Sequence, residues 1–283
     1  MTADRSPAGR PPGRPKPARI PPGDRPTYSS GEGWSFPLWI AHRGAGKLAP
    51  ENTLAAFRVG ASHGYRAFEC DVKLSADGLP FLLHDATLER TSSGQGTASL
   101  LSWSALSRLD AGGWHSRAFA GEPLPSLDAI AAYCIRNGFA LNIEIKPTPG
   151  DELATGAKVA TEVARLWSGQ PLPPLLSSFS PEALRAARDT DARWPRALLL
   201  DELRAGWFDE AVALGCVAVV TNHRVMDAAV IAQLHGAGLR ALVYTVNDDA
   251  SAQRLLALGI DGIITDAVDR FSPAVSAQSR VFA

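Results

Sequence analysis

The sequence has little of what would indicate a nucleic-acid-binding or membrane-spanning protein. Its 283 residues carry 28 Lys and Arg against 29 Asp and Glu, which gives a formal net charge of -1. A balanced charge offers no electrostatic argument for a nucleic-acid partner. No run of the sequence approaches the roughly 18 consecutive apolar residues that a membrane helix needs. We therefore expect neither a nucleic-acid partner nor a membrane span.

Cysteine is also scarce. Cys70, Cys134 and Cys216 are odd in number, far apart and surrounded by apolar residues. This pattern indicates buried thiols in a reducing compartment and argues against a disulfide framework. The sequence therefore predicts a cytoplasmic protein.

The amino-terminal segment lacks the continuous apolar stretch of a signal peptide and is rich in Pro, Gly and Arg. We expect a disordered tail over residues 1–36 and one folded domain over residues 37–283. With 46% hydrophobic residues, the chain can bury one large core or two modest ones.

From Trp39 onward, short apolar segments alternate with helical patterns. We expect eight strands, at residues 38–44, 68–74, 139–147, 173–180, 195–200, 216–223, 239–248 and 261–266. Helical patterns separate most of them, such as those at residues 181–190, 227–238 and 249–259. Nearly continuous apolar strands that alternate with helices favour a closed parallel (β/α)8 barrel, a TIM barrel. A doubly wound open sheet is the alternative.

Residues 86–126 depart from this alternation. They are rich in Gly, Ser and Trp and contain only one short helical pattern, at residues 102–109. We expect a small insertion that covers one end of the barrel.

The stretch FECDVKLSADGLPFLLHD, residues 68–85, carries charge where a buried strand would carry methyl groups. Side chains alternate along a strand, so Glu69 and Asp71 share one face while Phe68, Cys70 and Val72 share the other. One face of the predicted second strand is therefore acidic.

An antiparallel hairpin is expected to follow this strand. Asp77-Gly78 predicts a two-residue turn, because Gly accepts the positive φ that a type I′ turn requires. Pairs counted outward from that turn set Lys73 opposite Leu82 and Asp71 opposite His84. Opposed residues have Cβ atoms about 5 Å apart, so we expect His84 to lie beside the acidic face.

A third acid comes from the stretch LNIEIKP, residues 141–147. Alternation places Asn142, Glu144 and Lys146 on the inner face of the barrel. Three neighbouring carboxylates in an apolar barrel would repel and protonate unless a cation shared the space. Oxygen ligands from two Glu and one Asp suit Mg²⁺ or Ca²⁺ better than zinc.

Six segments together resemble the glycerophosphodiester phosphodiesterase family: AHRGAGKLAPENTLAAF, ECDVKLSADGLPFLLHDATLERTSSGQG, LNIEIKP, SSFS, YTVND and GIDGIITD. They occur in the family's order over roughly residues 38–268. The resemblance implies three sets of site residues: an acid/base pair of His42 and His84, metal ligands Glu69, Asp71 and Glu144, and phosphate contacts Arg43 and Lys146. Tyr244 stands where the family usually has Trp, and we expect it to line the substrate pocket.

The expected substrate is a small glycerophosphodiester, and the expected products are glycerol 3-phosphate and an alcohol such as choline, ethanolamine or glycerol. Such a reaction would serve lipid and glycerol metabolism. The family pattern makes His42 the base and His84 the acid. The nucleophile is either water or the neighbouring glycerol hydroxyl. Two alternatives remain: a lyase that stops at a cyclic phosphate, and a non-catalytic barrel that binds phosphodiesters.

Several other polar residues have simpler interpretations. Asp85 is expected to orient an imidazole or to cap a loop, and Asn52 in PENT is expected to cap a helix. Glu51 is left open. The remaining histidines are given no role: His63, His115, His223 and His235.

Overall fold

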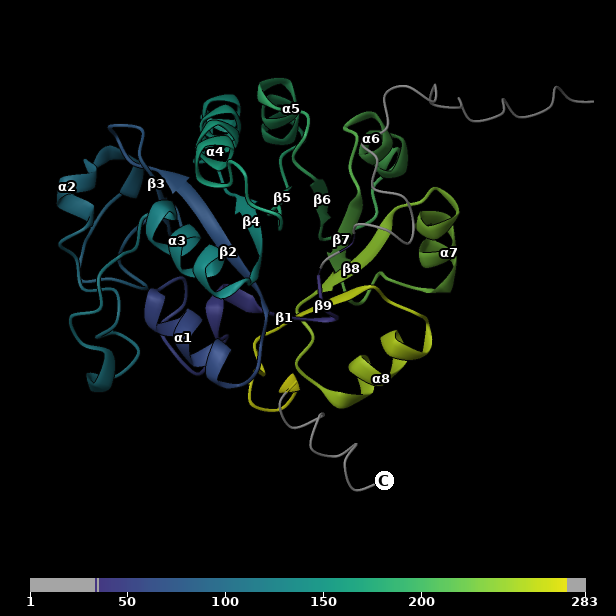
Figure 1. Ribbon diagram of the computed structural model, residues 1–283, viewed down its shortest axis with the longest axis horizontal. Helices are drawn as coiled ribbons and strands as arrows, with labels where there is room; N and C mark the ends of the chain where they lie inside the picture. The colour runs from purple at the N-terminus through teal and green to yellow at the C-terminus, as the bar shows by residue number, and fades with distance from the viewer. Residues whose placement is uncertain (1–33, 35, 274–283) are drawn as a thin grey trace, which may run out of the picture.

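Eight parallel strands close into a ring in the computed structural model, which describes residue 34 and residues 36–273 (Figure 1). The predicted tail lies almost wholly outside the described residues. Trp34 and Phe36, which are described, pack near the barrel strands, and Phe36 is buried there.

The ring follows the order of the strands along the chain. Its members are β1 (Trp39–Ala41), β2 (Ala67–Leu74), β4 (Ala140–Ile145), β5 (Leu175–Ser178), β6 (Arg196–Leu200), β7 (Ala218–Asn222), β8 (Arg240–Tyr244) and β9 (Gly262–Thr265). β1 pairs in parallel with β9 on one side and with β2 on the other, which closes the sheet. The TIM barrel is confirmed, and the open-sheet alternative is wrong.

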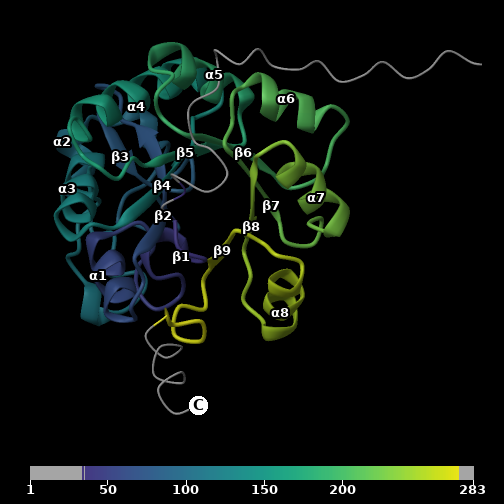
Figure 2. The ribbon, with the colours of Figure 1, turned by 45° about the vertical axis from the view of Figure 1, so that its right-hand side comes forward.

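Helices surround the strands (Figure 2). They are α1 (Leu54–Ser62), α3 (Leu127–Asn137), α4 (Glu152–Leu166), α5 (Pro181–Thr190), α6 (Trp207–Ala213), α7 (Ala228–Gly236) and α8 (Asp249–Ala257). Local sequence explains where several begin. At α5, for example, the Ser180 side chain accepts a hydrogen bond from the amide of Ala183, and Pro181 opens the first turn.

Side-chain alternation divides the apolar residues between two cores. The outward residues of β4 pack against α4 in a cluster that includes Leu141, Ile143, Ile145, Val159 and Val163. The inward apolar residues form a plug inside the barrel that includes Phe36, Ile40, Leu175, Leu199, Leu242 and Ile264. The polar residues of β2 and β4 lie nearer the carboxyl ends of the strands, so the plug forms the floor of a polar rim.

β3 (Pro80–Leu82) pairs antiparallel with β2 outside the ring, as predicted, but its register is shifted by one residue. Val72, and not Lys73, stands opposite Leu82. Leu83, and not His84, stands opposite Asp71, and its amide donates to the Asp71 carbonyl oxygen at 3.1 Å. The predicted two-residue turn is therefore wrong.

The shift arises because the loop has three residues, 76–78. The amide of Ser75 donates to the carbonyl of Leu79 at 3.0 Å, and Gly78 takes the left-handed conformation with a φ of 74°. The Asp77 carboxylate accepts hydrogen bonds from the Ser75 hydroxyl at 2.6 Å and from the amide of Trp103 at 2.8 Å. The turn is thus fixed by a contact with the insertion, which turn propensity alone does not include.

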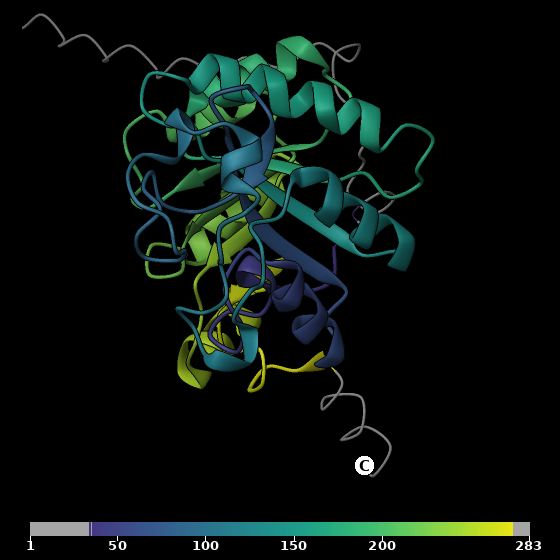
Figure 3. The same ribbon diagram turned by 90° about the vertical axis from the view of Figure 1, so that its left-hand side faces the viewer.

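The chain between β3 and α3 is the expected insertion, and it lies beside β2 outside the ring (Figure 3). It contains α2 (Trp103–Leu106) and the 3-10 helices η2 (Ala98–Leu100) and η3 (Arg117–Phe119). Its own small core includes Phe81, Leu83, Leu88, Leu106 and Leu124. The Glu122 carboxylate accepts a hydrogen bond from the amide of Ala55 at 2.9 Å, which ties the insertion to the start of α1.

Two predictions, on membrane-spanning helices and on the cysteines, can be compared with the described residues. Among them, no helix combines the length and apolarity needed to cross a membrane. All three cysteines are buried and unpaired, as expected.

Candidate metal and phosphodiester site

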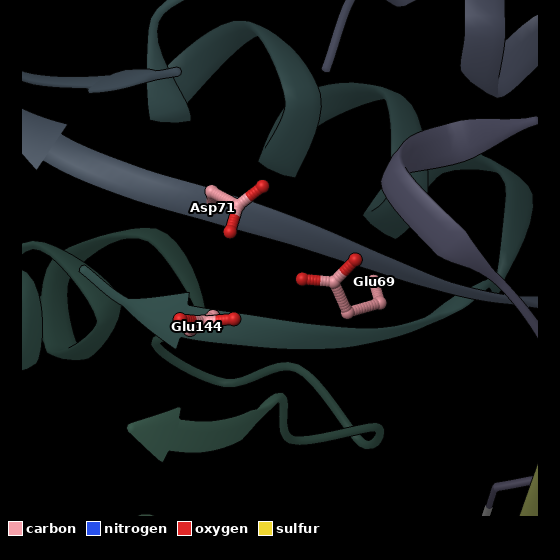
Figure 4. Close-up of side chains that lie close together, drawn as sticks. All are labelled: Glu69, Asp71 and Glu144. Carbon is pink, nitrogen blue, oxygen red and sulfur yellow. The ribbon is translucent and has the colours of Figure 1, made fainter. Parts of the chain in front are cut away.

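Three carboxyl groups converge at the rim of the barrel. Glu69 and Asp71 come from β2 and Glu144 comes from β4, and Figure 4 shows them side by side on these neighbouring strands. One oxygen of each lies within 4.8 Å of the others, and all three residues are buried. The strand register explains the convergence, because Asp71 and Glu144 are direct partners in the parallel pairing.

A cation would relieve the unfavourable burial and charge repulsion of the two glutamates. Burial, and then the charge of Asp71, raise the pKa of both Glu69 and Glu144. Glu69 Oε1 is buried and has no hydrogen-bond partner in the structure. Buried polar atoms are rarely left unpaired. The donor set therefore fits a hard divalent ion with oxygen ligands.

Asp71 differs from its two neighbours because the protein already neutralises it. Arg43 Nε and Lys146 Nζ each lie 3.3 Å from one of its oxygens. Burial alone would raise the pKa of Asp71, but these two cations lower it well below its usual range. Asp71 therefore stays ionised and supplies a fixed negative charge.

Asn52 also holds Asp71, which corrects the sequence prediction. Its amide Nδ2 donates to Asp71 Oδ2 at 2.8 Å, and its Oδ1 accepts from the Asp71 backbone amide at 3.1 Å. The helix cap is instead Thr53, whose hydroxyl accepts from the amide of Ala56. Asn52 has a φ of 58°, a left-handed conformation that Asn tolerates better than most residues, and this directs its side chain inward.

Arg43 links the carboxylates to the loop that follows β1. It lies in η1 (His42–Gly44) with a φ of 50°, and its backbone amide donates to Glu69 Oε2 at 3.0 Å. Its guanidinium donates to Glu51 at 2.8 Å. A non-glycine residue at positive φ is uncommon outside functional sites. Here the conformation turns both the amide and the side chain of Arg43 toward acids.

His42 is fixed by a carboxylate from the last strand of the ring. Its Nδ1 lies 2.6 Å from Asp266 Oδ1, and its Nε2 lies 3.8 Å from Glu69 Oε2. Burial lowers the pKa of His42, but Asp266 and Glu69 outweigh it, so the pKa is raised. Asp266 is held by Asn247, which donates to its Oδ2 at 3.0 Å.

Asp266 was not identified from the sequence, although one signal was present. It directly follows the last strand, β9, just as His42 directly follows β1. Gly46 allows the close approach of the two loops, since a Cβ there would lie 2.2 Å from the backbone oxygen of Asp266. Only glycine fits at that position.

His84 is fixed in the same way from outside the ring. Its Nδ1 lies 2.6 Å from Asp85 Oδ1, so Asp85 orients the imidazole as expected. Burial, and then Arg43, lower the pKa of His84, and the charge of Asp71 opposes them. The charge of Asp71 therefore acts on His84 despite the shifted hairpin register.

The other two predicted substrate contacts, Lys146 and Tyr244, both lie near Phe179. Lys146 Nζ donates to Glu144 Oε1 at 2.9 Å and lies 5.8 Å from the ring centre of Phe179. Tyr244 makes an edge contact with Phe179 and donates to Asp201 Oδ1 at 3.2 Å. The sequence analysis did not identify the buried Lys73, whose ammonium donates to the carbonyl of Lys146 at 3.2 Å.

Comparisons with known proteins agree with this geometry. The model of the glycerophosphoryl diester phosphodiesterase family matches residues 42–270. The Bacillus subtilis protein YhdW is 31% identical over 237 residues, which cover 81% of this chain and 94% of the relative. A phosphodiesterase structure from Oleispira antarctica, in complex with the product sn-glycerol-3-phosphate, has a TM-score of 0.79 at 30% identity and covers 85% of this chain and 97% of that one. The structure of glycerophosphodiester phosphodiesterase from Agrobacterium tumefaciens has a TM-score of 0.70 at 29% identity and covers 83% and 98%.

Proposed function

Because the chain belongs to the glycerophosphoryl diester phosphodiesterase family of phosphoric diester hydrolases, we propose that it hydrolyses glycerophosphodiesters to glycerol 3-phosphate and an alcohol with the aid of a divalent ion. One observation carries the proposal: three buried carboxylates, two carboxylate-oriented imidazoles and an arginine converge at the barrel rim. The Oleispira antarctica complex with sn-glycerol-3-phosphate supports the choice of product.

Glu69, Asp71 and Glu144 would hold the ion, and their oxygen ligands suit Mg²⁺ or Ca²⁺. When bound, such an ion supplies positive charge that stabilises the charge developing on the phosphoryl oxygens. This assignment explains why Oε1 of Glu69 has no hydrogen-bond partner and why the pKa values of Glu69 and Glu144 are raised.

Arg43 and Lys146 bind and orient the phosphodiester. A phosphodiester is a monoanion, and these two cations carry donors that match its oxygens. Each is held in place by a carboxylate, Arg43 by Glu51 at 2.8 Å and Lys146 by Glu144 at 2.9 Å. Both side chains are less than a quarter exposed, so they interact with an anion in a site of reduced screening.

His42 takes a proton from the attacking hydroxyl, and His84 gives a proton to the departing alcohol. In each imidazole, Nδ1 faces a carboxylate, which leaves Nε2 to exchange the proton. In the ion-free protein, the pKa of His42 is raised and that of His84 is lowered. These shifts favour the reverse assignment, with His42 as the acid and His84 as the base. However, part of the rise at His42 comes from Glu69, and a cation on that carboxylate would cancel this part.

The proposal is tested by phosphorus NMR of the purified protein with a set of glycerophosphodiesters, with Mg²⁺, Ca²⁺ and Mn²⁺ added in turn. We expect glycerol 3-phosphate as the final product and reversible inactivation by EDTA. Transient cyclic phosphate would identify the glycerol hydroxyl as the nucleophile. Cyclic phosphate as the only final product would make the protein a lyase, and full activity in chelator would contradict the metal role.

A further inference from the structure

One arginine of the insertion joins the two sides of the site. The guanidinium of Arg90 donates to Asp85 twice, through Nε to Oδ2 at 2.5 Å and through Nη2 to Oδ1 at 3.1 Å. Asp85 in turn fixes Nδ1 of His84. Arg90 therefore reaches the proposed acid through a single carboxylate.

The same guanidinium also reaches the phosphate side. Its Nη1 and Nη2 donate to the two oxygens of Glu51, each at 2.8 Å. Glu51 Oε1 accepts from Arg43 Nη1 at 2.8 Å. A continuous chain of charge-assisted hydrogen bonds thus runs from His84 through Asp85, Arg90 and Glu51 to Arg43.

We propose that Arg90 is a positioning residue that sets the imidazole of His84 and the guanidinium of Arg43 relative to each other. This inference rests on the proposed function, because it assigns Arg90 a role only through those two groups. Arg90 acts by orienting Asp85 and Glu51 and touches neither substrate nor ion.

The need for such a residue follows from where His84 lies. His42 directly follows a ring strand and is tied to Asp266, which directly follows another. His84 instead follows β3, a short strand outside the ring, and its side chain is 30% exposed. Among the described residues, Asp85 has hydrogen bonds from the side chains of His84 and Arg90. Without Arg90 it would keep only the imidazole and could rotate away with it.

Charge alone does not account for the arrangement. Arg90 presents a planar fork that meets both carboxylates with paired hydrogen bonds, which a lysine ammonium cannot reproduce. Arg90 is 45% exposed, and exposed ion pairs contribute little to folding. Its geometry is therefore better explained by the site than by the stability of the fold.

The test compares Arg90→Ala and Arg90→Lys with Arg165→Ala. Arg165 is a matched control, because it is also exposed and also bridges two carboxylates, Asp128 and Glu162, outside the site. The readouts are kcat and KM with Mg²⁺ present, for glycerophosphocholine and for a nitrophenyl ester of glycerol phosphate, and calorimetric binding of glycerol 3-phosphate. Thermal melts check that each variant folds.

We expect Arg90→Ala to lower kcat for glycerophosphocholine about 10- to 100-fold, the range typical of residues that orient a reacting group. The loss should be much smaller for the nitrophenyl ester, whose departure needs little protonation. In the His84→Ala background, Arg90→Ala should no longer distinguish the two substrates, because only its effect through Arg43 remains. Binding of glycerol 3-phosphate should weaken, because Arg43 loses its support. Arg90→Lys should restore the positive charge but recover little of the activity.

Three results would overturn the proposal while leaving the hydrolase function intact. These are Arg90→Ala behaving like Arg165→Ala, a loss from Arg90→Ala that is equal on both substrates while His84 is present, and full rescue by Arg90→Lys. Failure of the proposed function looks different, because the wild-type protein itself would then hydrolyse neither substrate.

Discussion

The two halves of the barrel rim are built from the same parallel strands but carry different chemistry. The half formed by the ends of β1, β2, β4 and β9 carries acids, cations and an imidazole: His42, Arg43, Glu69, Asp71, Glu144, Lys146 and Asp266. The half formed by the ends of β5 to β8 carries hydroxyl, amide and aromatic groups, including Ser177, Phe179, Asn222 and Tyr244. In that half, Asp201 accepts hydrogen bonds from Asn222 and Tyr244.

This difference shows how a symmetric scaffold becomes a directional site. The apolar plug below continues across the whole barrel, so both halves have the same floor. A phosphodiester has a charged centre and neutral glycerol and alcohol arms. The charged half suits its centre. We call the other half the neutral half because its groups are mostly uncharged; the Asp201 carboxylate there already accepts hydrogen bonds from Asn222 and Tyr244. This half can take an arm without the desolvation cost of another ion. Substitutions in the two halves should therefore have very different effects.

The largest effect is expected from Glu69→Gln, which keeps the shape of the side chain and removes its charge. A divalent ion held here would stabilise the transition state by several kcal/mol, so kcat/KM should fall on the order of 10³-fold. Steady-state kinetics measure the loss, and calorimetric titration of Mg²⁺ or Ca²⁺ into the variant measures the weaker binding. Unchanged ion affinity in Glu69→Gln would remove this carboxylate from the metal site.

The next largest effect concerns the two imidazoles. If His84 protonates the departing alcohol, His84→Ala should retain far more activity on a nitrophenyl ester than on a choline ester. His42→Ala should be impaired equally on both, because the nucleophile must be activated whatever group departs. A positioned acid or base contributes about 10²- to 10⁴-fold. A reversed pattern of kcat/KM would exchange the two roles.

Asp71→Asn should behave differently from Glu69→Gln in folding. Loss of the Asp71 charge leaves Arg43 with only Glu51, and Lys146 with only Glu144, as a close carboxylate partner. Loss of the Glu69 charge instead removes a repulsion. We expect Asp71→Asn to lower the ion-free free energy of unfolding by about 3 kcal/mol, the scale for a buried pair that loses one partner. Glu69→Gln should leave it unchanged or raised. Urea denaturation in EDTA distinguishes the two.

The sequence alone was enough to predict which side chains of the ring strands point into the barrel, because these follow the alternation along each strand. Glu69, Asp71 and Glu144 converge because inward positions on neighbouring parallel strands are set by a period of two. The hairpin register failed because Asp-Gly is compatible with a two-residue loop and with the three-residue loop that forms here, in which Gly78 is left-handed. The contact of Asp77 with Trp103, a residue 26 positions away, accompanies the longer loop. Turn propensity includes only local terms, so such a contact cannot be read from it.

Contacts at long sequence separation account for the other omissions. Asp266 meets His42 across 224 positions, and Arg90 meets Glu51 across 39. Neither pair has a spacing that a period could reveal. Asn52 was assigned to a helix cap because Asn is a good cap, and its positive φ, which turns it toward Asp71, became visible only in the fold.

The ion-free protein should lose stability as pH rises. Burial and Asp71 raise the pKa of Glu69 to about 7 and that of Glu144 to about 8, from 4.5 in both cases. A carboxyl with a raised folded-state pKa stabilises fully below its unfolded pKa, and this contribution is lost as pH rises through the folded value. Between roughly pH 5 and 7, the free energy of unfolding should fall by about 1.4 kcal/mol per pH unit for each carboxyl that is protonated in the folded state and ionised in the unfolded state. Asp71, whose pKa is lowered, loses its contribution only on acidification below about pH 4.

Urea denaturation in EDTA over this pH range measures the slope. The Glu69→Gln/Glu144→Gln double variant is the control, since it keeps both histidines and should lose most of the slope. Added Mg²⁺ or Ca²⁺ should stabilise the wild-type protein more at pH 8 than at pH 6. A wild-type slope equal to that of the double variant would contradict the raised pKa values.

The smallest effect is expected in the neutral half, from Tyr244→Phe. The Tyr244 hydroxyl donates to Asp201 at 3.2 Å, and its ring makes an edge contact with Phe179. Phenylalanine keeps the ring and removes the partly exposed hydroxyl, which is shared between Asp201 Oδ1 at 3.2 Å and the carbonyl oxygen of Leu200 at 3.4 Å. This loss is worth about 1 kcal/mol, so kcat/KM should change by no more than about fivefold. Tyr244→Trp, which restores the residue that the family usually has there, should also stay within this range and alter the ranking of alcohols more than the rate. Kinetics on choline, ethanolamine and glycerol esters measure both variants. A loss comparable to that of Glu69→Gln would show that the neutral half takes part in the chemistry and would end the contrast between the two halves.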